Sequence, residues 1–195
     1  MPVIAEGLAK LSDEKYAGGA ETGWSEEAFQ RVFLENYARV AGVLHRIVGD
    51  HSRAEDLALE AFWRLYRQPR LREGEGNPSG WLYRTAARLG IDSLRATTRR
   101  GRYEQQAGRL LNPHSDADPL EDVLRAERQS QVRRVLAVLR PAQAQLLILR
   151  ASGFSYQELS ETLQVKRGAV GTMLIRAENQ FRKRYERLYG KQEEL

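Results

Sequence analysis

The chain has 195 residues, 42% of them hydrophobic, which suffices for one large domain or two small ones. It carries a net charge of +5 and no cysteine, which excludes disulfides and thiolate metal sites, and His45, His51 and His114 are too scattered to suggest a ligand cluster. No apolar run approaches a membrane span and the N-terminus lacks a signal-peptide core, so we expect a cytoplasmic protein without membrane insertion, metal or cofactor.

Residues 1–24 are predicted to form a flexible N-terminal extension, because glycines interrupt them and their apolar positions show no sustained period. From residue 25 onward, apolar side chains recur at spacings of three and four residues, the period of a core-facing helix. Three such helices are expected over residues 25–102. Their apolar stripes predict a first helical domain.

Capping signals set the expected ends of these three helices. Ser25 opens the first helix and Gly49 stops it, while Ser52 and Glu55 predict a capping box at the start of the second helix. Asn77 followed by proline predicts the N-terminus of the third helix. The glycine-rich stretch before Asn77 is expected to be a loop.

The second half of the chain begins with a break in the helical period. Residues 103–119 are rich in Gly, Asn, Pro, Ser and Asp and predict a linker, after which helical spacing returns over residues 120–190. Ser155 and Glu158 predict a capping box on a short helix, which turns at Gln164 into a basic helix. The expected fold is therefore all-α, with two small helical domains joined by a flexible linker and a helix-turn-helix in the second domain.

Positive charge gathers in two places along the chain. Six arginines lie within residues 84–102 and seven basic residues lie within residues 166–187, a distribution that suits a polyanion bound at two places. The second helix of a helix-turn-helix can enter the major groove of duplex DNA. Trp81 and Tyr83 lead into the first arginine cluster, and aromatic rings beside arginines are typical of single-stranded nucleic-acid binding.

Catalysis is not expected from this sequence. We find no convincing nucleophile with a base, metal cluster or phosphate-binding glycine loop. Asp56 and Glu60 have the four-residue spacing of a carboxylate pair on one helical face, but nothing later in the chain offers the partners that a paired acid site needs. A solvated or partner-facing acidic surface is the better interpretation. Only metal-dependent turnover would support the alternative that the protein is a nucleic-acid-modifying enzyme.

Three blocks of the chain resemble, in order and spacing, the signature regions of sigma-70-type factors, and most closely the small extracytoplasmic-function (ECF) group. The blocks are AEDLALEAFWRLY, NPSGWLYRTAARLGIDSLR and GFSYQELSETLQVKRGAVGTMLIRAE, and the resemblance covers about residues 26–188. It implies an alternative sigma factor, a subunit that binds bacterial core RNA polymerase, recognises promoter DNA, helps to melt it and directs transcription initiation.

The resemblance implies a role for particular residues in each block. The helix that docks on the polymerase clamp would use Asp56, Leu57, Leu59 and Glu60. The helix that opens and reads the promoter −10 element would use Trp81, Tyr83, Arg84, Asp92, Leu94 and Arg95. The arginine cluster of the same helix adds Arg88, Arg99 and Arg100 as candidate −10 contacts. The recognition helix for the −35 element would contribute Lys166, Arg167, Val170, Thr172 and Arg176. Residues 70–80 would capture an unstacked base, and the linker would thread toward the polymerase active-site channel.

Some positions depart from the family pattern. They are Leu59 in the second helix, Arg88 in the third, and Gln164, Gly171 and Met173 in the helix-turn-helix. Lysine and arginine are frequent in the family where Gly171 and Met173 stand. We therefore expect weakened −35 binding or a shifted sequence preference.

The expected partners are core RNA polymerase and promoter DNA. Many family members are held inactive by an anti-sigma protein, so an anti-sigma factor is a candidate third partner, although the sequence identifies none. The alternative is a helix-turn-helix transcriptional regulator that binds duplex DNA as a dimer without acting as a polymerase subunit. The clamp-like block at residues 54–66 argues against that alternative.

Overall fold

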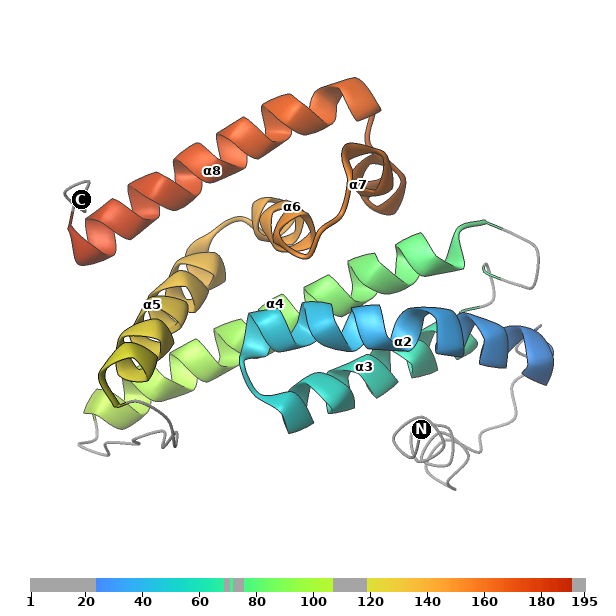
Figure 1. The fold of residues 1–195 in the computed structure, drawn as a ribbon, viewed down its shortest axis with the longest axis horizontal. Helices are drawn as coiled ribbons and strands as arrows, with labels where there is room; N and C mark the ends of the chain where they lie inside the picture. Colours follow the sequence, from blue (N-terminus) through green and yellow to red (C-terminus); the bar gives the residue numbers. More distant parts are fainter. Residues whose placement is uncertain (1–23, 69–70, 72–75, 107–118, 191–195) are drawn as a thin grey trace.

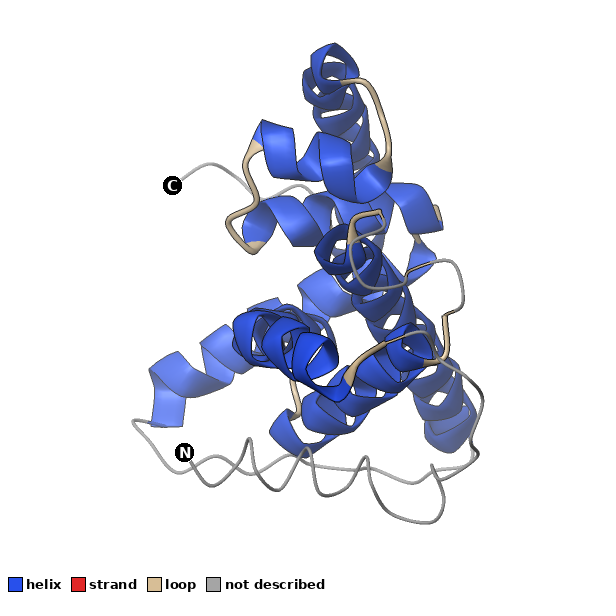
Figure 2. Cartoon of the chain, turned by 90° about the vertical axis from the view of Figure 1, so that its right-hand side faces the viewer, coloured by secondary structure: helices blue, strands red, loops and turns tan. Residues whose placement is uncertain are grey.

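The structure is a computed structural model that describes residues 24–68, 71, 76–106 and 119–190, with side chains described to residue 101 and again from residue 124. Every regular element in these ranges is a helix (Figure 2). This confirms the all-α class. The expected N-terminal extension and most of the expected loop and linker lie outside the described residues.

Three helices form the first domain: α2 (Glu26–Val48), α3 (His51–Tyr66) and α4 (Pro78–Gln106). Ser25 caps α2 by accepting a hydrogen bond from Ala28 N at 3.2 Å, and Gly49 ends the helix at a left-handed φ of 76°. Both boundaries agree with the sequence. Phe33 and Phe62 are fully buried with ring centroids 4.6 Å apart, so α2 and α3 share an aromatic core.

The expected capping box at the start of α3 is wrong. Asp50 caps this helix instead, because its Oδ1 accepts from Arg53 N at 2.6 Å. Ser52 lies inside the helix, and the Glu55 carboxylate lies 3.3 Å from His51 Nε2. Aspartate is at least as good an N-cap as serine, and capping at Asp50 lets the helix begin earlier.

The start of α4 agrees with the expected cap, since Asn77 Oδ1 accepts from Gly80 N at 2.7 Å. The helix continues to Gln106, inside the predicted linker. Its approach to α2 is close at Gly90, where a side-chain carbon would come within 2.6 Å of Ile47 Cδ1. Glycine therefore sets the contact distance between α2 and α4.

Four helices form the second domain: α5 (Pro119–Val138), α6 (Pro141–Ala151), α7 (Tyr156–Leu163) and α8 (Arg167–Tyr189). The capping box of α7 is confirmed: Glu158 N donates to Ser155 Oγ at 3.2 Å, and Ser155 N donates to Glu158 Oε2 at 2.8 Å. Buried Phe154 and Leu159 flank the box in the positions of a hydrophobic staple. Gln164 ends α7 at a left-handed φ of 56°, and α8 follows to complete the helix-turn-helix.

The two domains pack against each other through a continuous hydrophobic core. Helices α6 and α7 contact α4 on one side and α8 on the other, so they lie between these two long helices (Figure 1). Both halves of α4 contact the second domain, through Arg84 near its start and Arg95 in its second half. No helix in the described part of the chain has the length and apolarity needed to cross a membrane.

Candidate nucleic-acid interface

Two arginines of α4 that were expected to contact the −10 element point at helix ends in the second domain. Arg84 Nη1 donates to the carbonyl oxygen of Thr162, near the end of α7, at 2.9 Å. Arg95 donates from Nε to Ala137 O at 3.0 Å and from Nη2 to Leu139 O at 2.6 Å, at the end of α5. The last carbonyls of a helix lack intrahelical partners and carry partial negative charge. Each guanidinium therefore caps a helix of the other domain.

Tyr83, the residue before Arg84, is buried where the domains meet. Its hydroxyl donates to Asn36 Oδ1 at 2.8 Å, and its ring meets Phe154 edge-on with centroids 4.9 Å apart. Only 6% of Tyr83 is exposed, and this burial raises the pKa of its phenol. In this arrangement Tyr83 presents no ring face to a nucleic-acid base.

The remaining basic candidates on α4 lie on the surface. Arg88, Arg99 and Arg100 are exposed, and Arg88 Nε lies 4.0 Å from a carboxylate oxygen of Asp92 one turn away. Such an exposed pair is weak and leaves the arginine available to a phosphate. The neighbouring Ala87 is fully buried and belongs to the core.

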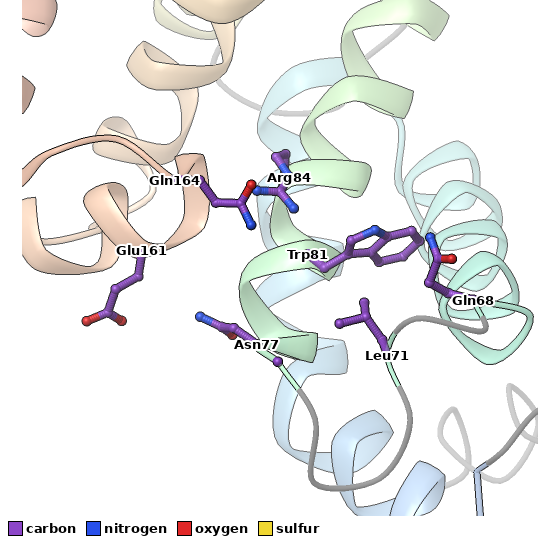
Figure 3. Close-up of a pocket in the computed structure, with 8 residues that line it drawn as sticks. Gln68, Leu71, Asn77, Trp81, Arg84, Glu161 and Gln164 are labelled. Atoms are coloured by element: carbon purple, nitrogen blue, oxygen red, sulfur yellow. The ribbon is translucent and has the colours of Figure 1, made fainter.

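Trp81 is half-buried beside a cavity of about 330 Å³ between the domains. In Figure 3 its indole lies next to Leu71 and Gln68, and α7 forms the opposite side. The lining residues come from the start of α4, the segment before it, and α7: Gln68, Leu71, Gly76, Asn77, Trp81, Arg84, Glu161 and Gln164. Polar groups and one aromatic ring face the same space, which suits a planar polar group such as a nucleobase.

The first turns of α8 carry most of the −35 candidates on the surface. Lys166 precedes the helix as its N-cap residue, and exposed side chains follow at Arg167, Thr172 and Arg176. Val170 is different because it is fully buried in the core. Its side chain holds α8 in place and does not face solvent.

The two departures in α8 are packing positions. Met173 is half-buried and packs against the core, while a side-chain carbon at Gly171 would lie 3.7 Å from Tyr156 Cε2. Both positions therefore lie partly toward the interior of the second domain. The exposed cations of this helix end lie beside them.

The acidic block on α3 separates into surface and core residues. Asp56 is exposed, and the Glu60 carboxylate accepts from Arg64 Nε at 2.8 Å. Leu57 is buried with 6% exposure, and Leu59 is half-buried against the core. The two carboxylates thus face outward, and Leu57 anchors the helix that carries them.

Sequence reasoning missed the contact between Arg39 of α2 and Glu158 of α7. Arg39 Nη1 lies 2.7 Å from Glu158 Oε1, and the guanidinium carbon lies 3.9 Å from the ring centroid of Phe154. The hydrogen bond from Arg39, followed by that from Ser155 N, lowers the pKa of the Glu158 carboxyl to about 2. The staple pattern could have identified Phe154 as buried, but no local signal pairs Arg39 with α7.

The described residues contain no group of three or more His, Asp or Glu side chains placed to hold a metal ion.

Two family models match separate parts of the chain. The family model described as Sigma-70 region 2 matches residues 32–100, and the one described as Sigma-70, region 4 matches residues 129–180. The chain belongs to the sigma-70 family, in its ECF group. We call the first domain the region 2 domain and the second the region 4 domain.

Similar proteins include sigma factors of other bacteria. The chain is 31% identical over 150 residues to the ECF RNA polymerase sigma factor SigE of Mycolicibacterium smegmatis, covering 74% of this chain and 56% of that protein. It is 27% identical over 178 residues to the RNA polymerase sigma-H factor of Pseudomonas aeruginosa, covering 87% and 92%. The chain thus spans little more than half the length of the SigE relative.

One similar solved structure is the sigma factor RpoE in complex with the anti-sigma factor NepR from Bartonella quintana. That likeness has a TM-score of 0.44 at 22% identity and covers 81% of this chain and 96% of that one.

Proposed function

We propose that the protein is an alternative sigma factor that binds bacterial core RNA polymerase and directs promoter recognition, DNA melting and transcription initiation. The observation that carries this proposal is the pairing, in one chain, of a capped helix-turn-helix with a region 2 domain whose long helix is basic. A sigma factor needs both surfaces because it must contact two promoter elements.

The region 4 domain would contact duplex DNA at the −35 element through α8. Arg167, Thr172 and Arg176 are exposed on the first half of this helix, and the capped α7 packs against it. Recognition helices of this motif enter the major groove with their N-terminal residues facing the bases. Arginines there can bind guanine edges or phosphates.

The region 2 domain would contact the melted −10 element through α4. Exposed Arg88, Arg99 and Arg100 supply phosphate contacts along one helix, and the cavity beside Trp81 offers space for an unstacked base. Flipping a base out costs a few kcal/mol, which binding in such a pocket offsets. Arg84 and Tyr83 would join this surface only when the second domain moves away from them.

Core polymerase would dock on the outer face of α3. Asp56 and Glu60 lie one turn apart on this face, and each presents a carboxylate to solvent at least in part. Paired acids of this kind complement a basic partner surface and steer its association. The region 2 core holds the helix through Leu57.

Transcription with defined components tests the proposal. Purified protein is added to bacterial core RNA polymerase with a library of genomic fragments, and RNA starts are mapped. We expect specific starts whose upstream sequences share two spaced elements. Failure of the protein to bind core at low salt would overturn the proposal, and a stable dimer with tight operator binding would then establish the regulator alternative.

A further inference from the structure

We infer that the free chain adopts a closed state in which the region 4 domain covers part of the −10 face of α4 while leaving the −35 end of α8 exposed. This inference rests on the proposed function, because the DNA roles of α4 and α8 belong to it. The closed state is defined by four contacts that cross between the domains: Arg39 with Glu158, Tyr83 with Phe154, Arg84 with Thr162, and Arg95 with Ala137 and Leu139.

In the closed state, the N–H groups of Arg84 and Arg95 donate to backbone carbonyl oxygens of the region 4 domain. DNA phosphates would need the same N–H groups. Arg84 is hydrogen-bonded to the end of α7, and Arg95 makes two hydrogen bonds at the end of α5. Helix C-termini carry partial negative charge, so they stand in for phosphate groups. A guanidinium engaged in this way cannot also hold a phosphate with the same N–H groups. Closing and −10 binding therefore compete for Arg84 and Arg95.

A contact that combines an ion pair with aromatic rings joins α2 to the start of α7. The Arg39 guanidinium lies over Phe154 at 3.9 Å and over Tyr83 at 5.3 Å while it pairs with Glu158. The ion pair remains partly exposed, with 39% of the Arg39 side chain and 37% of the Glu158 side chain accessible. Partly exposed pairs are weakened by salt, so this contact can open without unfolding either domain.

A fourth arginine, Arg133, crosses in the opposite direction, from the region 4 domain toward the end of α2. A side-chain carbon built at Gly49 would lie 2.6 Å from Arg133 Nη1, so the guanidinium lies directly against this glycine. Arg133 is half-buried, and burial lowers its pKa. Contacts therefore extend from Arg39 to the far end of α2.

The two DNA surfaces differ in what the closed state leaves accessible. Lys166, Arg167 and Arg176 remain exposed, whereas Tyr83 is buried and Arg84 is engaged. Glu161 and Gln164 of α7 also line the cavity beside Trp81. The closed chain can thus bind duplex DNA through α8. Single-stranded DNA can contact the whole DNA-binding face of α4 only after the domains separate.

Fluorescence energy transfer between the domains measures closure directly. The chain has no cysteine, so Gln30→Cys on α2 with Asn179→Cys on α8, both exposed, gives two specific labels. Arg39→Ala removes the central contact, and Arg31→Ala is the matched control, since Arg31 is exposed on the same helix. We expect high transfer in the parent and the control. Arg39→Ala should lower the closed-to-open ratio about tenfold, the loss expected for an ion pair and a cation–π contact together.

Binding of a labelled single-stranded oligonucleotide pool gives the second readout. Arg39→Ala should bind it more tightly than the parent and the Arg31→Ala control, while affinity for duplex DNA stays unchanged. Low transfer in the parent, equal to that of Arg39→Ala, would overturn the closed state. If Arg39→Ala lowered energy transfer without raising the affinity for single-stranded DNA, closure and −10 binding would not compete for Arg84 and Arg95.

Two controls separate this inference from other causes. Transfer that appears only between differently labelled copies, and that grows with protein concentration, would indicate domain exchange between chains and contradict closure within one chain. Transfer is measured without polymerase, so a closed chain that fails to support transcription would refute the proposed function and leave the closed state standing.

Discussion

Arg39 and Glu158 lie 119 residues apart in the chain and form a 2.7 Å ion pair that joins the region 2 and region 4 domains. The same Glu158 carboxylate closes the capping box of α7 by accepting from Ser155 N at 2.8 Å. One side chain therefore links the start of the helix-turn-helix to the packing of the two domains.

Acid should weaken the closed state through Glu158. The pKa of its carboxyl is about 2, below the ordinary 4.5, and the hydrogen bond from Arg39 is the largest cause, so the contribution of this ion pair to closure is complete above about pH 4.5 and is lost as the pH falls toward 2. The loss should stay below about 1 kcal/mol, since the pair is partly exposed. Energy transfer measured from pH 6 to pH 3 checks this.

Glu158→Gln is the informative variant for that titration. Glutamine can still accept from Ser155 N in a capping box, but it carries no charge for Arg39. We expect the variant to show lower transfer at neutral pH and a smaller change with acid. An unaltered pH profile in Glu158→Gln would mean that another group governs the response.

Gln164→Gly should stabilise the region 4 domain. Gln164 has a φ of 56°, a left-handed conformation that costs a residue with a side chain about 1 kcal/mol and that glycine adopts freely. Denaturant unfolding should show a gain of about 1 kcal/mol or less. Gln164→Ala keeps the strain and is the control. An equal gain in both variants would contradict the conformational explanation.

Gly171→Ala should also stabilise the fold, by about 0.5–1 kcal/mol, because it removes a glycine from a helix interior. The new methyl group would meet Tyr156 at 3.7 Å, an ordinary contact distance. Gly90→Ala is the opposite case, since its methyl group would come within 2.6 Å of Ile47 Cδ1. Thermal unfolding of both variants should give shifts of opposite sign, and a lower melting temperature for Gly171→Ala would mean that α7 and α8 pack more closely.

Arg176→Ala should lower transcription from promoters that depend on a −35 element. Arg176 is exposed on the recognition helix, and loss of one base contact costs about 1–3 kcal/mol, or roughly fivefold to 150-fold in affinity. Arg182→Ala, an exposed position farther along α8, is the matched control. Equal run-off transcript levels from the parent and Arg176→Ala would show that this arginine makes no contact with the promoter.

Replacing Asp56 and Glu60 together with alanine should weaken binding to core polymerase about tenfold while the fold stays intact. Both carboxylates lie on the outer face of α3, away from the core residue Leu57. Glu35→Ala on α2 is an exposed acidic control. Unchanged affinity, measured by fluorescence anisotropy with labelled protein, would remove the pair from the interface.

Local chemistry made much of the fold predictable. Ser25, Gly49 and Ser155 act as expected because capping depends on a few neighbouring residues. The start of α3 was missed because two good caps stand close together and the earlier one, Asp50, wins. Helix spacing predicted the buried stripes, including Phe33 and Phe62.

Contacts between the domains could not be predicted in this way. A guanidinium binds a phosphate or a helix-end carbonyl with the same donors, so the sequence around Arg84 and Arg95 does not distinguish DNA contact from domain packing. Val170 was expected at the DNA surface, although its position on the apolar stripe of α8 already indicated burial. The partners of Arg39 and Arg84 lie in a separate domain, beyond the reach of local patterns.

The most direct test of the sigma factor proposal is permanganate mapping of DNA melting on a promoter found in the fragment library. Core polymerase with this protein should make thymines around the −10 element reactive, whereas core alone or the protein alone should not. The proposal would be contradicted if the protein bound the upstream duplex DNA but the thymines around −10 became no more reactive than with core polymerase alone.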